Sequence, residues 1–225
     1  MAENLRSRTV LPRGRHAAPR RVVRASQRER MLDAVAESVA ENGYARVAVA
    51  DVIERAGVSR KTFYEHFANK EECFLAAYDA GVAMVLEAID AAVAAAPAPN
   101  AAAAAGTPAY VETLSRNPAL ARAFFVEVLG AGPAALARRE LVLERFTAQL
   151  EAIYAAARET LDVLPDAPPR YVFRAAVGAV NELVTEELLR HGPERLPELA
   201  AAIFDVEMRL LVGQDLAERI RASVS

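Results

Sequence analysis

The chain has 225 residues, 53% of them hydrophobic, and a formal net charge of −3. This length allows one or two domains with a sizeable core, and the small net charge indicates no overall preference for nucleic acid. The single cysteine, Cys73, excludes an internal disulfide and a multi-cysteine metal site and fits a reducing cytoplasm. No apolar stretch is long enough to span a bilayer, so we expect a cytoplasmic protein without a membrane partner.

Positive charge is concentrated at the N-terminus. Residues 1–25 hold seven arginines against Glu3, a net of +6, whereas residues 26–80 carry −3 and residues 81–225 carry −6. Arginine, proline and glycine with few apolar residues predict a disordered arm over 1–25. Such an arm either contacts DNA phosphates or remains a solvated tail.

A first helix is predicted from Ser26, which forms a capping box with Glu29 three residues later. Apolar residues at helical spacing follow, and Gly43 is expected to end the helix. Alanine and leucine favour helices throughout the chain, and no long alternating β pattern occurs, so we predict an all-α fold.

The stretch from Asp51 to Phe67 predicts two short helices joined by a tight turn. Gly57 can end the first helix in the left-handed conformation, and Ser59 can cap the second. The second helix places its polar side chains away from Phe63 and Phe67; these polar residues are Arg60, Lys61, Thr62, Tyr64 and His66. A short capped helix that begins with two cations suits a DNA major groove, although many ordinary helical corners share this spacing.

Asn69 is predicted to cap a long fourth helix, whose start offers an anion site beside Lys70. Residues 94–108 contain alanine, proline and glycine without any charge, so we predict a loose loop there, with Pro108 starting a short helix. Further helices are predicted after Pro118, from Pro133 to about Leu161, from about Arg170 to Arg190, and after His191-Gly192-Pro193, making about nine in all.

The helix over 170–190 has two apolar faces, of which the bundle core needs one. Phe173, Val177, Val180, Val184 and Leu188 form one face, and Val172, Ala176, Ala179 and Leu183 form the other. We therefore predict a homodimer through the last two long helices, although the same stripes could close a monomeric bundle.

The segment from Ser26 to Tyr78 resembles the DNA-binding domain of the TetR family of transcriptional regulators. The resemblance depends on the ordered strings Ala56-Gly57-Val58-Ser59, Thr62-Phe63-Tyr64, His66-Phe67 and Lys70-Glu71, with Gly43-Tyr44 before them. The later helices resemble actinobacterial members in length and order. The resemblance implies a helix-turn-helix domain at 26–70 and a C-terminal ligand-binding and dimerisation domain at 71–225.

The resemblance also implies roles for single residues in a DNA operator complex. Seven residues would contact double-stranded DNA: Ser59, Arg60, Lys61, Thr62, Tyr64, His66 and Lys70. The operator would be palindromic, with half-sites one helical turn or a multiple apart. One position departs from the family, which usually places Thr or Ser before the second helix where this chain has Val47, Ala48 and Val49.

The family usually holds a small-molecule effector in the C-terminal domain, and binding there releases the operator. The sequence offers a largely apolar candidate pocket for an unknown effector: Phe124, Phe125, Glu127, Val128, Phe146, Tyr154, Phe173, Arg174, Val177 and Asn181. The resemblance therefore implies a ligand-responsive repressor.

The sequence has two alternative interpretations, an enzyme and a helical interaction module. The chain has no phosphate loop, nucleophile elbow or metal-ligand spacing, so we expect neither an enzyme nor a cofactor; the one candidate pair for nucleophilic chemistry is His66 with Cys73. The alternative is a helical interaction or ligand-binding module with weakened or lost DNA binding. The missing hydroxyl at the second helix and the net charge of −3 over 26–80 favour it, whereas Arg60, Lys61 and Lys70 oppose it.

Overall fold

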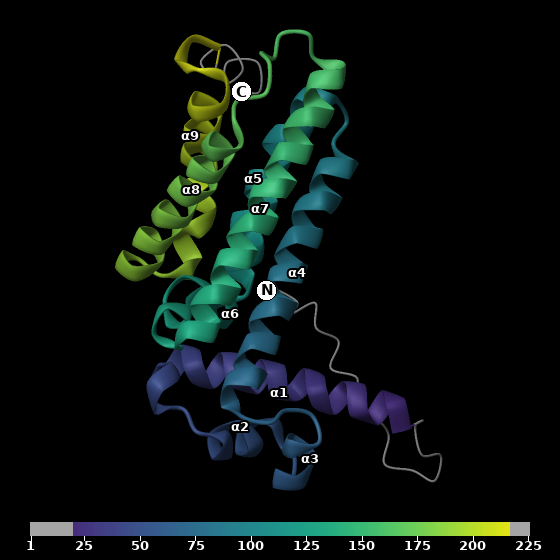
Figure 1. The fold of residues 1–225 in the computed structure, drawn as a ribbon, viewed down its shortest axis with the longest axis vertical. Helices are drawn as coiled ribbons and strands as arrows, with labels where there is room; N and C mark the ends of the chain where they lie inside the picture. Colours follow the sequence, from purple (N-terminus) through teal and green to yellow (C-terminus); the bar gives the residue numbers. More distant parts are fainter. Residues whose placement is uncertain (1–19, 217–225) are drawn as a thin grey trace.

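A computed structural model of the chain describes residues 20–216, and every regular element in this range is a helix (Figure 1). None of these helices is long and apolar enough to cross a membrane. The all-α prediction is confirmed. The described residues form these nine α-helices and three 3-10 helices: α1 Arg20–Asn42, η1 Tyr44–Arg46, α2 Val49–Ala56, α3 Arg60–Tyr64, α4 Lys70–Ala95, α5 Pro99–Arg116, α6 Pro118–Phe125, η2 Glu127–Gly130, α7 Pro133–Thr160, α8 Arg170–Arg190, η3 Pro193–Leu199 and α9 Ala200–Val212.

The helices form two units that share α4. Figure 1 shows α1, α2 and α3 together at one end of the molecule, with α3 at the tip. Helix α4 leaves this unit and runs along the second one, in which α5 and α7 lie beside it and α8 and α9 form the opposite side. Helix α6 lies between the two units and packs on α1. The predicted order of a helix-turn-helix unit followed by a helical bundle is confirmed.

The first helix begins earlier than predicted. Helix α1 starts at Arg20 and not at Ser26, so the last part of the predicted disordered arm is helical. The rest of that arm, residues 1–19, lies outside the described residues. The prediction was wrong because Ser26 and Glu29 suit a capping box, but arginine and valine before them also continue a helix at little cost.

The predicted loop over 94–108 was also wrong. Only residues 96–98 separate α4 from α5, and Pro108 lies inside α5. An interior proline costs a helix about 3 kcal/mol. Tertiary packing offsets this cost, because α5 buries Thr107, Val111 and Leu114 against the bundle. Pro99 occupies the first turn, where a missing N–H is harmless, and alanine has the highest helix propensity.

The main hydrophobic core runs through both units, and Tyr154, Phe173 and Leu211 form a smaller second cluster in the bundle. The main core includes Val35 of α1, Phe63 of α3, Phe74 and Val82 of α4 and Leu196 of η3, each at most 1% exposed. The N-terminal part of α4 therefore completes the small unit, while its remainder belongs to the bundle. Because α4 is continuous, movement at one end is transmitted to the other.

The outward face of α8 differs from the predicted second face. Ala176 is fully buried, whereas Tyr171, Ala175 and Gly178 are exposed along one side of the helix. A Cβ atom placed on Gly178 would have no neighbour within 4 Å among the described residues. The side of α8 that faces the core is a stripe spaced by threes and fours, made of Phe173, Ala176, Val180, Val184 and Leu188.

Candidate nucleic-acid interface and internal cavity

The turn between α2 and α3 is fixed by local backbone geometry. Gly57 has φ 61° and ψ 43°, which is the left-handed region where glycine carries no penalty. Its N–H donates to the carbonyl of Glu54 at 3.2 Å, and the N–H of Val58 donates to that of Ile53 at 3.2 Å. Ser59 Oγ then accepts from the N–H of Thr62 at 3.0 Å, which caps α3. The predicted corner and cap are confirmed.

Helix α3 separates its buried and exposed residues as predicted. Phe63 is fully buried and Phe67 nearly so, whereas Arg60, Lys61 and Tyr64 are exposed. The Lys61 side chain is 87% exposed, and its ammonium lies 4.0 Å from a carboxylate oxygen of Glu65. Such an exposed pair is weak and leaves the cation available to a partner.

Helix α1 holds the corner in place from behind. Arg30 Nη1 donates to the carbonyl of Ala56 at 2.7 Å, at the end of α2. Arg55 on α2 pairs with Glu41 on α1 through both terminal nitrogens. The orientation of α3 is therefore set by the whole three-helix unit and not by the turn alone.

Two further cations lie beside α3 that the sequence did not single out. Arg24 Nη2 donates to the carbonyl of Glu65 at 3.0 Å, and the Arg28 guanidinium lies 5.6 Å from the centre of the Phe67 ring. Both side chains are exposed. Together with Arg60 and Lys61 they form what we call the cationic edge. The helical spacing of Arg24 and Arg28 could have revealed it, had α1 been predicted to start before Ser26.

His66 and Lys70 are less accessible than the residues of α3. His66 follows α3, and burial, helped by the nearby charges of Arg24 and Arg28, lowers the pKa of its imidazole. Lys70 Nζ donates to the carbonyl of Tyr44 at 2.7 Å and lies 4.0 Å from the centre of the Tyr44 ring. Burial lowers the pKa of this ammonium. Lys70 therefore holds η1 against α4 and has only its remaining N–H donors for another ligand.

The start of α2 confirms the unusual feature noted in the sequence. Ala48 is the cap residue and has no side-chain acceptor. Its own N–H donates to Asp51 Oδ2 at 2.7 Å, which supplies one half of a capping box. The start of α2 therefore carries the carboxylate of Asp51 at its third position and no side-chain hydroxyl at its cap.

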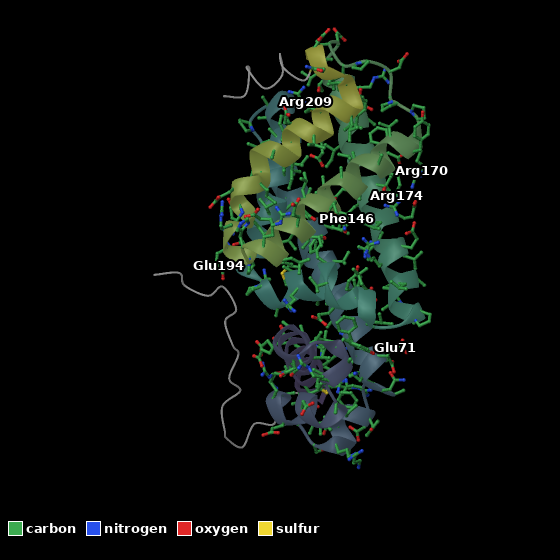
Figure 2. The ribbon with its side chains drawn as sticks, turned by 90° about the vertical axis from the view of Figure 1, so that its left-hand side faces the viewer. Glu71, Phe146, Arg170, Arg174, Glu194 and Arg209 are labelled. Carbon is green, nitrogen blue, oxygen red and sulfur yellow. The ribbon has the colours of Figure 1, made fainter. Side chains whose placement is uncertain are left out.

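The C-terminal bundle encloses a cavity of about 350 Å³, which we call the cavity. This volume is typical of a site for a small molecule. Residues from α4, α5, α6, α7, α8, α9 and the α7–α8 connection line it, and most are apolar. In Figure 2, Phe146 lies inside the bundle, whereas Arg170 and Arg174 lie at its outer edge.

Six of the ten predicted pocket residues line the cavity: Phe124, Phe125, Phe146, Tyr154, Val177 and Asn181. Four do not. Arg174 pairs with Glu140 on the surface at 2.9 Å, and Phe173 packs on Tyr154 with its ring centre 5.5 Å away. Val128 is buried in the main core, and Glu127 bonds to the N-terminal unit. Helical spacing could not tell which face of each helix turns to the cavity.

Several polar residues that line the cavity were not predicted from the sequence. They are Tyr78, Thr107, Tyr110, Arg139, Gln149 and Glu207. Thr107 Oγ1 lies 3.3 Å from Glu207 Oε2. Burial raises the pKa of the Glu207 carboxyl to about 7 and that of the Tyr78 phenol to about 12. No local pattern marks Glu207, because its partner lies 100 residues away in the sequence.

Glu127 connects the cavity wall to the N-terminal unit. It lies in η2, directly after the α6 residues that line the cavity, and its Oε2 accepts from the N–H of Tyr44 at 2.8 Å. Its Oε1 lies 3.3 Å from Arg122 Nε, and only 12% of its side chain is exposed. This contact ties α6 and η2 to η1, which precedes the helix-turn-helix corner.

The candidate pair for nucleophilic chemistry is not supported. Cys73 is fully buried, and burial raises the pKa of its thiol to about 12, so the reactive thiolate is suppressed. Its Sγ lies 3.7 Å from the carbonyl of Met31, an ordinary core contact. Within residues 20–216, no group of three or more His, Cys, Asp or Glu could hold a metal ion.

Similarity to known proteins agrees with this geometry. Residues 31–77 match the model of bacterial regulatory proteins of the tetR family. The chain is 30% identical over 178 residues to the HTH-type transcriptional regulator EthR of Mycolicibacterium smegmatis, covering 78% of this chain and 80% of that protein. It is 34% identical over 65 residues to the HTH-type transcriptional activator FasR of the same organism, covering 29% and 30% of the two chains.

Solved structures share the fold. The fatty acid degradation regulator FadR of Bacillus halodurans superposes with a TM-score of 0.72 at 18% identity, covering 82% of this chain and 94% of that one. FadR of Bacillus subtilis, solved in complex with stearoyl-CoA, gives a TM-score of 0.71 at 20% identity, covering 83% and 98%. With this fold, the capped α3 and the relationship to EthR, the chain belongs to the TetR family and is a DNA-binding transcriptional regulator.

Proposed function

We propose that the protein is a homodimeric repressor that leaves a palindromic operator when an apolar small molecule fills the cavity. The observation that carries the DNA-binding part is the exposed, capped start of α3 beside the cationic edge. Seven residues would contact the operator: Ser59, Arg60, Lys61, Thr62, Tyr64, His66 and Lys70. Arginine can bind the edge of a guanine with two hydrogen bonds, and a helix start can accept a phosphate.

The exposed face of α8 supports the dimer. Tyr171 is 72% exposed and Leu189 60%, and small residues on the same helix allow a second helix to approach closely. Leu210 of α9 is 42% exposed. We propose that α8 and α9 of two subunits form a four-helix interface around a two-fold axis. The two copies of α3 would then enter successive major grooves.

The cavity and its neighbours support an effector. Residues up to about 70 would bind DNA, and residues from 71 onward would bind the effector and dimerise, with α4 shared between the two. EthR and both FadR proteins are regulators, the two FadR structures share this fold, and the Bacillus subtilis FadR was solved in complex with stearoyl-CoA. FasR is a transcriptional activator. If this protein raised transcription when bound to its operator, it would be an activator and not a repressor.

Replacing Lys61 with alanine is expected to weaken operator binding by about tenfold or more. Each base contact contributes about 1–3 kcal/mol, and a dimer loses two of them. The fold should be unaffected because the Lys61 side chain is 87% exposed. Gel shifts with the DNA upstream of the gene would measure the change, with Arg158→Ala in the last turn of α7 as the control. Wild-type affinity of Lys61→Ala would show that α3 does not dock as proposed.

Replacing Arg28 with alanine is expected to weaken binding equally for all DNA sequences. A phosphate contact contributes about 0.9 to the slope of log affinity against log salt, so a dimer should lose about two. Fluorescence anisotropy between low and moderate salt would give the slope. An unchanged slope would exclude Arg28 from the interface.

A further inference from the structure

The polar side chains of the cavity have hydrogen-bonding capacity that other residues of the bundle do not fill. Glu207 Oε2 accepts a hydrogen bond from Thr107 Oγ1 at 3.3 Å. The described residues give the Glu207 carboxylate no other side-chain hydrogen bond. Tyr110 stands one helical turn beyond Thr107 on α5, also lines the cavity, and makes no hydrogen bond through its hydroxyl within residues 20–216. Glu207 and Tyr110 are partly exposed and both line the largely apolar cavity, so their remaining hydrogen-bonding capacity is available to a ligand there.

Aromatic rings line the same cavity. The ring centres of Tyr110 and Phe146 lie 6.0 Å apart in an edge-on contact, and those of Tyr78 and Phe124 lie 4.7 Å apart. All four side chains line the cavity. Ring faces carry partial negative charge and attract cations, and a carboxylate does so more strongly. The electrostatic character of this part of the cavity is therefore suited to a cation.

We propose that the effector is an elongated apolar molecule with a protonated amino group, which Glu207, Thr107 and Tyr110 bind inside the cavity. This proposal rests on the proposed effector function of the same cavity and names its ligand class. The ammonium would donate to Glu207 and to the Tyr110 oxygen, and the apolar body would lie along α7. The α7 residues that line the cavity run from Arg139 to Ala157, about 27 Å at 1.5 Å per residue.

The neighbouring charges favour this choice over a carboxylic acid. Burial raises the pKa of the Glu207 carboxyl to about 7, and the hydrogen bond from Thr107 opposes this shift. Arg139 is the other charged group of the cavity, and its charge acts on Tyr78. A free carboxylate would have to use Arg139 and lie in the same cavity as Glu207, an unfavourable placement for two like charges.

Three ligands with the same chain test the proposal: decylamine, decanol and decanoic acid. Isothermal titration calorimetry on the full chain at pH 8 is expected to show the amine binding at least about tenfold more tightly than the other two. Glu207→Gln should remove this preference, whereas Arg139→Gln should leave it intact. Tighter binding of decanoic acid, or an amine affinity that Glu207→Gln does not change, would overturn the proposal.

The pH dependence supplies a second readout. An ammonium ion requires the ionised form of Glu207, so amine affinity should fall about tenfold from pH 8 to pH 6 in the wild type and stay constant in Glu207→Gln. Glu207 faces Thr107 and Tyr110, both from α5, and the same cavity is lined by Tyr78 from α4 and Arg139 from α7. Burial raises the pKa of both phenols, so they stay neutral in this range. Equal pH slopes in the two proteins would contradict the proposal.

Two controls separate a loss of amine binding from misfolding and from a failure to release the operator. The raised pKa of Glu207 means that its charged form is penalised in the folded state, so folded stability falls as the pH rises from 4.5 through about 7. Glu207→Gln should therefore melt at the same temperature as the wild type or higher at pH 8, which excludes misfolding as the cause of lost binding. Amine binding without release of operator DNA would leave the ligand assignment intact and refute the effector function.

Discussion

Replacing Glu127 with alanine is expected to lower the free energy of unfolding by about 2 kcal/mol and to loosen the join between the two units. The carboxylate accepts from the N–H of Tyr44 at 2.8 Å and pairs with Arg122, and only 12% of the side chain is exposed. A hydrogen bond to a charged group contributes about 1.5–3 kcal/mol, and its loss leaves the Tyr44 N–H without this acceptor.

Two measurements would check this result. Denaturant unfolding at a fixed subunit concentration gives the stability, since the stability of a dimer depends on concentration. Hydrogen exchange at the Tyr44 amide should become faster in Glu127→Ala and less so in Glu127→Gln, which keeps an acceptor of the same shape. Unchanged exchange at Tyr44 would show that another group holds η1 in place.

The functional consequence is an altered operator affinity without any change in the DNA-contacting residues. Tyr44 also accepts from Lys70 through its carbonyl, and its ring packs on Phe74 with the centres 4.9 Å apart. Loss of the Glu127 contact therefore disturbs Tyr44, which begins η1 and contacts α4, and α4 positions the helix-turn-helix unit. A coupling of a few kcal/mol between cavity and DNA site suffices for regulation.

Replacing Gly81 with alanine is expected to destabilise the protein by about 1 kcal/mol, although alanine is the better helix former. A Cβ atom at this position would lie 2.7 Å from Leu120 Cγ and closer still to Cδ1. The whole end of the Leu120 side chain, which is 8% exposed, would have to move. Overpacking costs about 1–3 kcal/mol, and the gain in helix propensity recovers about 1 kcal/mol.

A double-mutant cycle would identify the contact responsible. Leu120→Ala alone should cost about 2–5 kcal/mol, but Gly81→Ala with Leu120→Ala should cost less than the sum, because the new methyl group has room once leucine is removed. Gly130→Ala in η2 is the control, since no described atom lies within 4 Å of its added Cβ. Additive effects at positions 81 and 120 would show that α4 and α6 do not meet at this point.

The helix-turn-helix corner could be predicted from the sequence because its determinants are local. Gly57 ends one helix, Ser59 begins the next, and Asn69 Oδ1 accepts from the N–H of Glu72 at 2.8 Å to start α4. Each of these interactions joins residues at most a few positions apart, so spacing and residue type suffice to recognise them. The same holds for the helix predicted from Pro133 to about Leu161, which the structure confirms as α7 from Pro133 to Thr160.

The errors occurred where tertiary packing overrides local preference. Pro108 ends a helix by its own chemistry, yet α5 continues through it because Gly106 and its neighbours pack closely on α4. The effector residues were recognised only in part, since periodicity finds apolar faces but not what each face meets. Aromatic side chains such as Phe124 and Phe146 were predicted in this way. The sequence around Glu207 looks like that of any exposed acidic residue, and only the packing of α5 on α9 brings this carboxylate into the cavity.

The sequence by itself therefore determined the helices, the corner that presents α3 and the residues at its tip, because these depend on capping and on short periodic patterns. Only the tertiary structure decided which charges lie together. Glu127 meets Tyr44 across 83 residues and Glu207 meets Thr107 across 100, and no local pattern encodes such pairs. Long-range packing buries these groups, and burial gives an ordinary carboxylate a binding or coupling role.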